Sequence, residues 1–236
     1  MMNKIFNKNM FIMAIVIMIG AVTITYFIAD LQHQSQLTQI ATDHSVEIDT
    51  IEENNLNFTN GFLESSVLLD TAREDRAYGN YHFDIAYLFY STALSEKNIS
   101  LFGQYRNQTI DNCSQAMPQY MVSHQNFQLA STFFYNTRNY TSNQQYLVLL
   151  EKYVNLTASG AELTLLRYNA SHYLLMLAEN MTFVNDTVIL ENMTDIEELF
   201  NMTMEMYKVA LIEYVEIQDE IEEYNIKGFS TIREPH

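Results

Sequence analysis

Residues 194–224 read TDIEELFNMTMEMYKVALIEYVEIQDEIEEY and carry the clearest structural signal in the chain. Bulky residues recur there at alternating steps of four and three, and the acidic residues fall between them. This spacing predicts an amphipathic helix that packs one face into a helical bundle. Thr194 and Asp195 supply the expected N-terminal cap, and Gly228 the expected stop. The repeating positions are Ile196, Phe200, Thr203, Tyr207, Ala210, Tyr214, Ile217, Ile221 and Tyr224.

The rest of the chain also favours helices. Only two Pro and six Gly occur among 236 residues, too few for the many turns of an all-β sandwich or the Gly-rich loops of a doubly wound α/β fold. We therefore predict an all-α fold with an antiparallel helical bundle. Pro118 is expected in a first helical turn, and Gly160 is where a helix would be interrupted. The bundle covers residues 61–228 before a tail at 229–236, with further helices over 62–95, 101–137 and 143–179 and an exposed loop over 181–194.

A heptad pattern precedes the bundle. Its positions step by four and three, the spacing of a coiled-coil seam, so we interpret residues 30–60 as a helical stalk. A break or kink is expected at its end, where Asn residues and Gly61 cluster between positions 54 and 61. The seam positions are Leu37, Ala41, His44, Ile48 and Ile51.

The N-terminal region predicts a membrane anchor. Residues 10–29 read MFIMAIVIMIGAVTITYFIA without a charge, and as a helix they would span roughly 30 Å, the thickness of a hydrocarbon core. Lys4 and Lys8 precede this run and Asp30 follows it, which places residues 1–9 in the cytoplasm and the remaining chain outside. We predict a single-pass plasma-membrane protein with an extracellular domain. A cleaved signal peptide is the alternative, but the apolar run is long and Phe27 fits a cleavage site poorly.

The charge balance restricts the partners. The chain has 12 Lys and Arg against 29 Asp and Glu, a formal net charge of −17. Ten of these basic residues and all 29 acidic ones follow the apolar run, so that part carries −19. Such a surface repels phosphate backbones, which argues against nucleic-acid binding. A solvated surface is the simpler reading, and cation binding is the minority one.

Sites for N-glycosylation are unusually frequent. The pattern Asn-x-Ser/Thr occurs eleven times, whereas a shuffled chain of this composition would contain roughly three. All eleven follow the apolar run, in agreement with the topology derived from charge, although an Asn-rich composition alone is the competing explanation. Asn112 and Asn185 are poorer acceptors because Cys113 and Asp186 stand in their middle positions. The nine predicted acceptors are Asn57, Asn98, Asn107, Asn139, Asn155, Asn169, Asn180, Asn192 and Asn201.

The chain lacks recognisable catalytic chemistry. Its six His form no HxxxH or HExxH pair, and no GxSxG, Walker or GxGxxG motif occurs. Cys113, the single cysteine, cannot form a disulfide within one chain, which leaves a buried thiol or a bond to another copy. We therefore predict no catalytic residue, metal site or cofactor, and a protein that is not an enzyme.

These features favour a structural or interaction protein at the cell surface. Its predicted partners are the membrane, which it spans once, and other proteins or further copies of itself. The second hypothesis is a ligand-binding sensory domain that acts through a separate transducer, since fewer than ten residues remain in the cytoplasm to carry a signal. An enzyme is the third.

Overall fold

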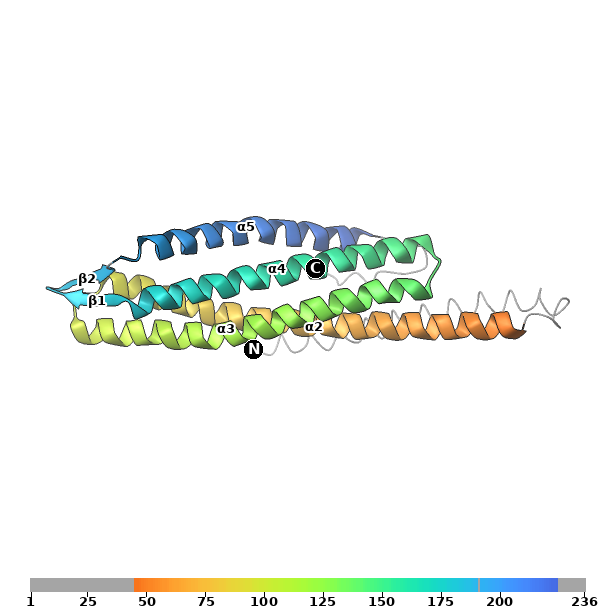
Figure 1. The fold of residues 1–236 in the computed structure, drawn as a ribbon, viewed down its shortest axis with the longest axis horizontal. Coiled ribbons are helices and arrows are strands. Elements are labelled where there is room, and N and C mark those ends of the chain that lie inside the picture. The colour runs from red at the N-terminus through yellow and green to blue at the C-terminus, as the bar shows by residue number, and fades with distance from the viewer. Residues whose placement is uncertain (1–44, 191, 225–236) are drawn as a thin grey trace, which may run out of the picture.

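The structure is a computed structural model that describes residues 45–190 and 192–224. Its fold is all-α, as the sequence predicts. The described residues form four long helices that run back and forth along one axis, with a small β-hairpin at one end (Figure 1). The elements are α2 (Ser45–Ser95), α3 (Ile99–Thr137), the short 3₁₀ helix η1 (Arg138–Tyr140), α4 (Gln144–Glu179), β1 (Met181–Val184), β2 (Thr187–Leu190) and α5 (Thr194–Glu223).

The last helix, α5, confirms the amphipathic pattern. All nine repeating positions are buried or half-buried, whereas acidic positions such as Glu205 and Glu216 are exposed. The predicted cap is wrong: Thr194 is already helical, and Met193 at the N-cap forms no side-chain cap bond. Acidic residues in the first turn instead favour this helix start through the helix dipole. Gly228, the expected stop, lies outside the described residues.

The predicted break between stalk and bundle is also wrong. Helix α2 runs from residue 45 to 95 without interruption, because the heptad seam continues through the Asn-rich segment with Phe58 and Phe62 in register with Ile51. The Phe62 ring packs 5.6 Å from that of Phe134, and Phe58 contacts the start of α4. Burial of such a ring outweighs the poor helix propensity of a Gly, which costs about 1 kcal/mol.

Two expected disturbances elsewhere do not interrupt their helices. Pro118 lies in the interior of α3 on an exposed position, so water can hydrate the carbonyl that loses its donor. Gly160 lies within α4, where it permits close packing. A Cβ atom there would come 2.5 Å from the Phe127 ring of α3, a distance at which the two helices would have to separate.

The segment predicted as an exposed loop contains a β-hairpin instead. Strands β1 and β2 pair in antiparallel register, with Met181 opposite Leu190. Asn185 and Asp186 form the turn with φ angles of 49° and 58°, as a type I′ turn requires. Phe183 packs 5.4 Å from Phe102 of α3, so the hairpin covers the end of the core. The three sequons of this segment suggested a loop, so sequence reasoning overlooked the apolar residues that form the two strands.

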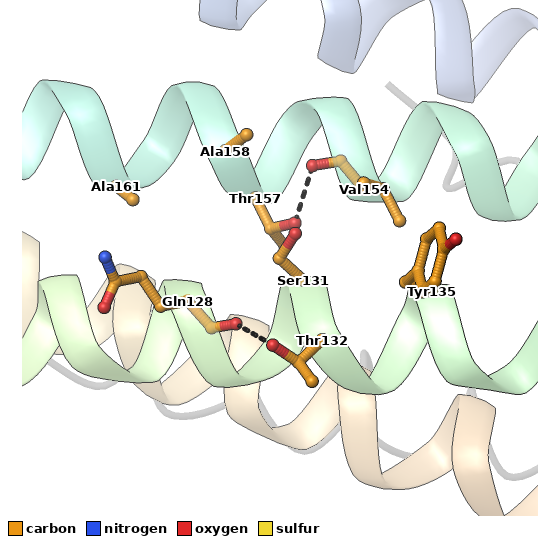
Figure 2. Close-up of a pocket in the computed structure, with 8 residues that line it drawn as sticks. All are labelled: Gln128, Ser131, Thr132, Tyr135, Val154, Thr157, Ala158 and Ala161. Atoms are coloured by element: carbon orange, nitrogen blue, oxygen red, sulfur yellow. Dashed lines mark hydrogen bonds between the residues drawn. The ribbon is translucent and has the colours of Figure 1, made fainter.

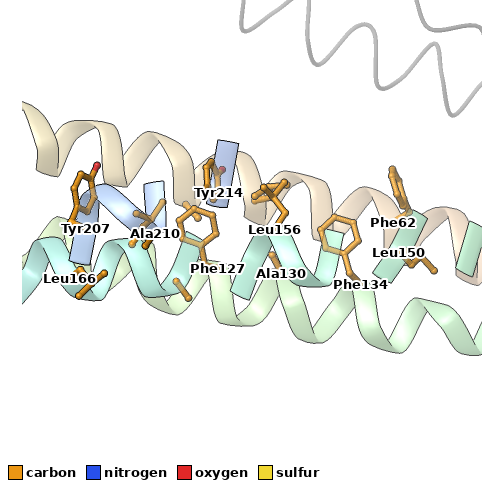
Figure 3. Packing of buried hydrophobic residues seen from close by; sticks show 14 residues of the cluster. Phe62, Phe127, Ala130, Phe134, Leu150, Leu156, Leu166, Tyr207, Ala210 and Tyr214 are labelled. Carbon is orange, nitrogen blue, oxygen red and sulfur yellow. The ribbon is translucent and has the colours of Figure 1, made fainter. Parts of the chain in front are cut away.

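The helices pack in chain order, α2 on α3, α3 on α4 and α4 on α5, while α2 and α5 share no comparable backbone interface. Their interior contains two apolar clusters, one toward each end of the bundle. Figure 3 shows the cluster toward the α3–α4 connection, where all four helices contribute. Its labelled residues are Phe62, Phe127, Ala130, Phe134, Leu150, Leu156, Leu166, Tyr207, Ala210 and Tyr214.

The predicted membrane span over residues 10–29 and the stalk up to residue 44 lie outside the described residues. Among the helices from residue 45 onward that the structure describes, none combines the length and the apolar character needed to cross a membrane. The start of α2 projects past the connection between α3 and α4 (Figure 1). The segment predicted to lead to the membrane therefore joins the bundle at the end opposite the hairpin.

Candidate interaction surface and glycosylation sites

An arginine on α4 links three helices in the middle of the bundle. The Cζ atom of Arg167 lies 4.4 Å from the ring centre of Phe83 on α2 and 4.0 Å from that of Tyr207 on α5. One guanidinium nitrogen is also 4.0 Å from Asp84, and the Arg167 side chain is only 12% exposed. A cation against a ring face contributes about 0.5–2 kcal/mol. Arg167 therefore ties α2 to α5, whose backbones do not pack closely.

A second cationic contact joins α2 directly to α5. Arg73 Nε donates a 3.0 Å hydrogen bond to the Tyr214 hydroxyl, and the Cζ atom of Arg76 lies 4.4 Å from the centre of the same ring. One nitrogen each of Arg76 and Arg167 is buried without a hydrogen-bond partner in the described part of the chain. Sequence reasoning missed this cluster, although Arg76 occupies a core position of the α2 heptad. Because the guanidinium groups face rings, the cluster serves packing.

A buried histidine lies between α2 and α3. Nδ1 of His82 is 3.0 Å from Oδ1 of Asn112, and the rings of Tyr78 and Tyr81 pack edge-on against it. Its Nε2 is buried with no partner within residues 45–190 and 192–224. The same residues contain no group of three or more His, Cys, Asp or Glu placed to hold a metal ion. His82 therefore has the surroundings of a packed core side chain.

Burial suppresses ionisation in the core. Desolvation raises the pKa of the Cys113 thiol to about 12, and desolvation together with nearby Glu197 raises the pKa of Tyr90 to about 12. Cys113 is a free and fully buried thiol, so it is protonated at neutral pH and shielded from other chains. Burial likewise raises the pKa of Asp75, partly offset by a hydrogen bond from Asn126. Cys113 and Tyr90 are therefore closed off from any substrate.

One depression of the described surface is an open groove of about 520 Å³ between α3 and α4 (Figure 2). Its two threonine hydroxyls bond within their own helices: Thr132 donates to the carbonyl of Gln128, and Thr157 to that of Val154. A small-molecule site usually has polar groups that converge on the ligand. The residues that line this groove are Gln128, Ser131, Thr132, Tyr135, Val154, Thr157, Ala158 and Ala161.

The sequon asparagines are distributed over the bundle and favour its hairpin end. Eight of the eleven are exposed, as attachment of a bulky glycan requires, whereas Asn57, Asn112 and Asn169 are half-buried. Nothing in the fold therefore prevents glycans at most of these positions. The exposed ones are Asn98, Asn107, Asn139, Asn155, Asn180, Asn185, Asn192 and Asn201.

Local geometry separates a favourable acceptor from an unfavourable one. Asn98 caps α3 through Oδ1, which accepts from the backbone N–H groups of Ser100 and Leu101, and the exposed side chain leaves Nδ2 for a glycan. Asn112 is tied down at both atoms, since Oδ1 faces His82 and Nδ2 donates to the Gln108 carbonyl at 2.8 Å. The structure thus adds a physical reason to the weak acceptor sequence at Asn112.

One side of α2 combines exposed apolar residues with an absence of sequons. No Asn-x-Ser/Thr pattern occurs between Phe58 and Lys97, the longest sequon-free stretch of the described residues. Within and just before it, eight large apolar side chains face solvent. Six of them share one side of the helix, and we call these six the outer face of α2. They are Leu56, Leu63, Val67, Tyr78, Tyr81 and Leu88. Sequence reasoning did not identify this face, because the heptad pattern was followed only as far as Ile51.

Comparison with known proteins gives no assignment. No protein-family model matches the chain, and neither does a curated protein nor a solved structure.

Proposed function

We propose that this chain is a membrane-anchored structural or interaction protein of the cell surface, N-glycosylated, and a subunit of a membrane or envelope complex. The observation that carries the proposal is the division of its surface. Exposed sequon asparagines occupy the hairpin end and the α3–α4 side, while α2 exposes apolar side chains over a stretch without sequons. An exposed apolar patch that contains no glycosylation site is typical of a surface that contacts another protein.

The proposed topology follows from the sequence and agrees with the direction of α2. Residues 10–29 would cross the membrane with residues 1–9 in the cytoplasm, and only the 15 residues 30–44 separate this span from Ser45. Helix α2 is roughly 75 Å long at 1.5 Å per residue. Standing on such an anchor, it would carry the hairpin and its sequons to the far end of the molecule.

A sensory ligand-binding domain is the second candidate, because the groove between α3 and α4 has the volume of a small-ligand site. Its lining argues against it, since the threonine hydroxyls bond to their own helices. A reproducible rise in melting temperature with a small metabolite would favour this candidate. Loss of that shift in a Ser131→Leu variant would locate the ligand in the groove.

The proposal is tested by extraction and glycan analysis of the full chain from its native cells. The chain should stay with the membrane under alkaline carbonate, and mass spectrometry of its peptides should show glycans at exposed acceptors such as Asn98 and Asn139. Release by carbonate would overturn the anchor. Unmodified Asn at all eleven sequons would overturn the glycoprotein assignment and weaken the topology.

A further inference from the structure

The outer face of α2 has the spacing of a second packing stripe. Its six residues are separated by 7, 4, 11, 3 and 7 positions, which are close to whole numbers of helical turns, so they share one side of the helix. Leu56, Tyr81 and Leu88 are each about 60% exposed. The inner seam of the same helix faces α3 and α4, so no described element covers this stripe.

We propose that the outer face of α2 binds the same face of a second copy of this chain, with the two helices parallel and related by a two-fold axis. This inference rests on the proposed function in one respect, the common orientation of anchored copies. It goes further in naming the partner and the surface. A two-fold interface must be self-complementary, and a stripe of Leu, Val and Tyr satisfies that condition against its own copy.

The length of chain outside the described residues favours a parallel arrangement. Fifteen residues, 30–44, separate the predicted span from the start of α2. Even fully extended they reach only about 50 Å, less than the length of α2, and their heptad spacing would make them shorter as a helix. Two copies in one membrane therefore present α2 in the same direction and at the same height. Equivalent residues then meet at the interface, Tyr81 with Tyr81 and Leu88 with Leu88.

The available area suits such a pair. Half-exposed side chains of this size offer on the order of 100 Å² each, so the six residues provide roughly 600 Å² per copy, near the 800 Å² of a specific interface. The acidic Glu74 lies between the two apolar halves of the stripe and would face its own copy. Anchoring in one membrane raises the local concentration of the two copies and so favours the contact.

Helix α5 offers a competing surface, which we consider less suitable. Met202, Val209 and Ile212 are exposed there, with Glu205 and Glu216 on the same side of the helix, and Glu205 forms an ion pair with Lys208 at 2.6 Å. A second copy on this surface would bring Glu216 close to its equivalent, as pairing through α2 does for Glu74. The α2 stripe follows directly on the predicted stalk, so the anchor fixes its position. Helix α5 follows the hairpin and has no such direct connection to the stalk. The two surfaces can be distinguished in one experiment.

Disulfide cross-linking through one introduced cysteine tests the proposal. The native Cys113 is fully buried and should not take part. The full chain would be expressed with Leu88→Cys or Tyr81→Cys, with Leu129→Cys on α3 and Val209→Cys on α5 as exposed controls. Mild oxidation of native membranes should give a disulfide-linked dimer at both α2 positions, about tenfold more than at Leu129. The reason is that only equivalent cysteines on the two paired α2 helices lie within disulfide range of each other.

The competing outcomes are distinct. Dimer at Val209 without dimer at Leu88 would assign the contact to α5 and overturn the proposal, as would equal cross-linking at all four positions or none at any. Carbonate extraction and glycan analysis of the same membranes report on the proposed function separately. An anchored, glycosylated chain without α2 cross-links refutes only the pairing. Cross-links at Leu88 in a chain released by carbonate would support the pairing while refuting the anchor.

Discussion

The two faces of α2 differ far more in environment than in composition. On the inner face, Leu69 and Phe83 are 3% and 2% exposed, whereas Leu63 and Leu88 on the outer face are 36% and 62% exposed. Both faces carry large apolar residues at helical spacing, yet only one has a partner in the described structure. The comparison shows that an apolar stripe indicates a contact without saying whether the partner lies in the same chain. The proposed pairing would give the outer face its partner in a second copy of the chain.

The largest expected effect comes from breaking the inner face. Phe83→Ala should lower the free energy of unfolding by about 3–5 kcal/mol, because it leaves a cavity and removes one ring from Arg167. Tyr81→Ala on the outer face should change it by about 0.5 kcal/mol or less. Chemical denaturation of the full chain in detergent, at concentrations too low for pairing, measures both. Equal losses would mean that the two faces do not differ as described.

Two glycines test how closely the inner surfaces approach. Gly160→Ala should destabilise by about 1–3 kcal/mol, because the added methyl group meets the Phe127 ring. Gly103→Ala is the matched control, since nothing lies within 4 Å of its Cβ position, and it should stabilise α3 by roughly 0.5–1 kcal/mol. Melting temperatures of the two variants should therefore shift in opposite directions. A stabilised Gly160→Ala would show that α3 and α4 are further apart.

The buried thiol of Cys113 on α3 and a thiol placed on the outer face of α2 should differ in reactivity. Cys113 has its pKa raised by burial from 9.0 to about 12, so at pH 8 its thiolate fraction is about a thousandfold smaller than for an ordinary thiol. The native chain should react with a thiol reagent at a small fraction of the rate of the unfolded chain, whereas Leu88→Cys should react readily in monomeric protein. Rapid labelling of native Cys113 would contradict its burial.

The same pKa shift gives stability a defined pH dependence. The unfolded thiol titrates near 9 and the folded one near 12, so the unfolded chain loses its proton first. The contribution of Cys113 is complete below pH 9 and declines as the pH rises from about 9 toward 12. Cys113→Ala should flatten that part of the stability profile, although it also costs packing. Chemical denaturation at pH 8 and pH 10.5 compares the slopes, and identical slopes would refute the assignment.

The smallest expected effects concern glycans. Asn139→Gln should remove one glycan from the chain, visible as a discrete mass loss, with little change in stability because the Asn139 side chain is exposed. Asn112→Gln should leave the mass pattern unchanged, because both amide atoms of Asn112 bond within the fold. Mass spectrometry of the intact protein distinguishes the two. A glycan found at Asn112 would show that modification precedes folding of that region.

The sequence predicted the all-α class and the buried positions of α5, because apolar residues repeated there without competing signals. It failed where a local preference opposed long-range packing. The Asn residues near position 55 and Gly61 suggested a break, but the seam formed by half-buried Phe58 and buried Phe62 holds α2 together. Pro118 suggested a helix start and Gly160 an interruption, yet both lie inside helices. Pro118 is tolerated because it is exposed to solvent, and Gly160 because it lets α4 pack closely on Phe127.

The surface was less predictable than the core. Sequons can be found from the sequence, but their exposure depends on how helices pack, as the opposite surroundings of Asn98 and Asn112 show. The outer face of α2 has a regular spacing of its own, which becomes meaningful only after the structure assigns Leu69 and Phe83 to the interior. Likewise, Arg76 stands out only when Tyr214 of α5 is placed against it.

The most direct test of the account is the side of the membrane on which the bundle lies. Leu129→Cys, on the exposed side of α3, and Asn7→Cys, before the predicted span, would be labelled in intact cells with a membrane-impermeant thiol reagent. We expect label at Leu129→Cys in intact cells, and at Asn7→Cys only after permeabilisation. The reverse pattern would place the bundle in the cytoplasm and contradict the account.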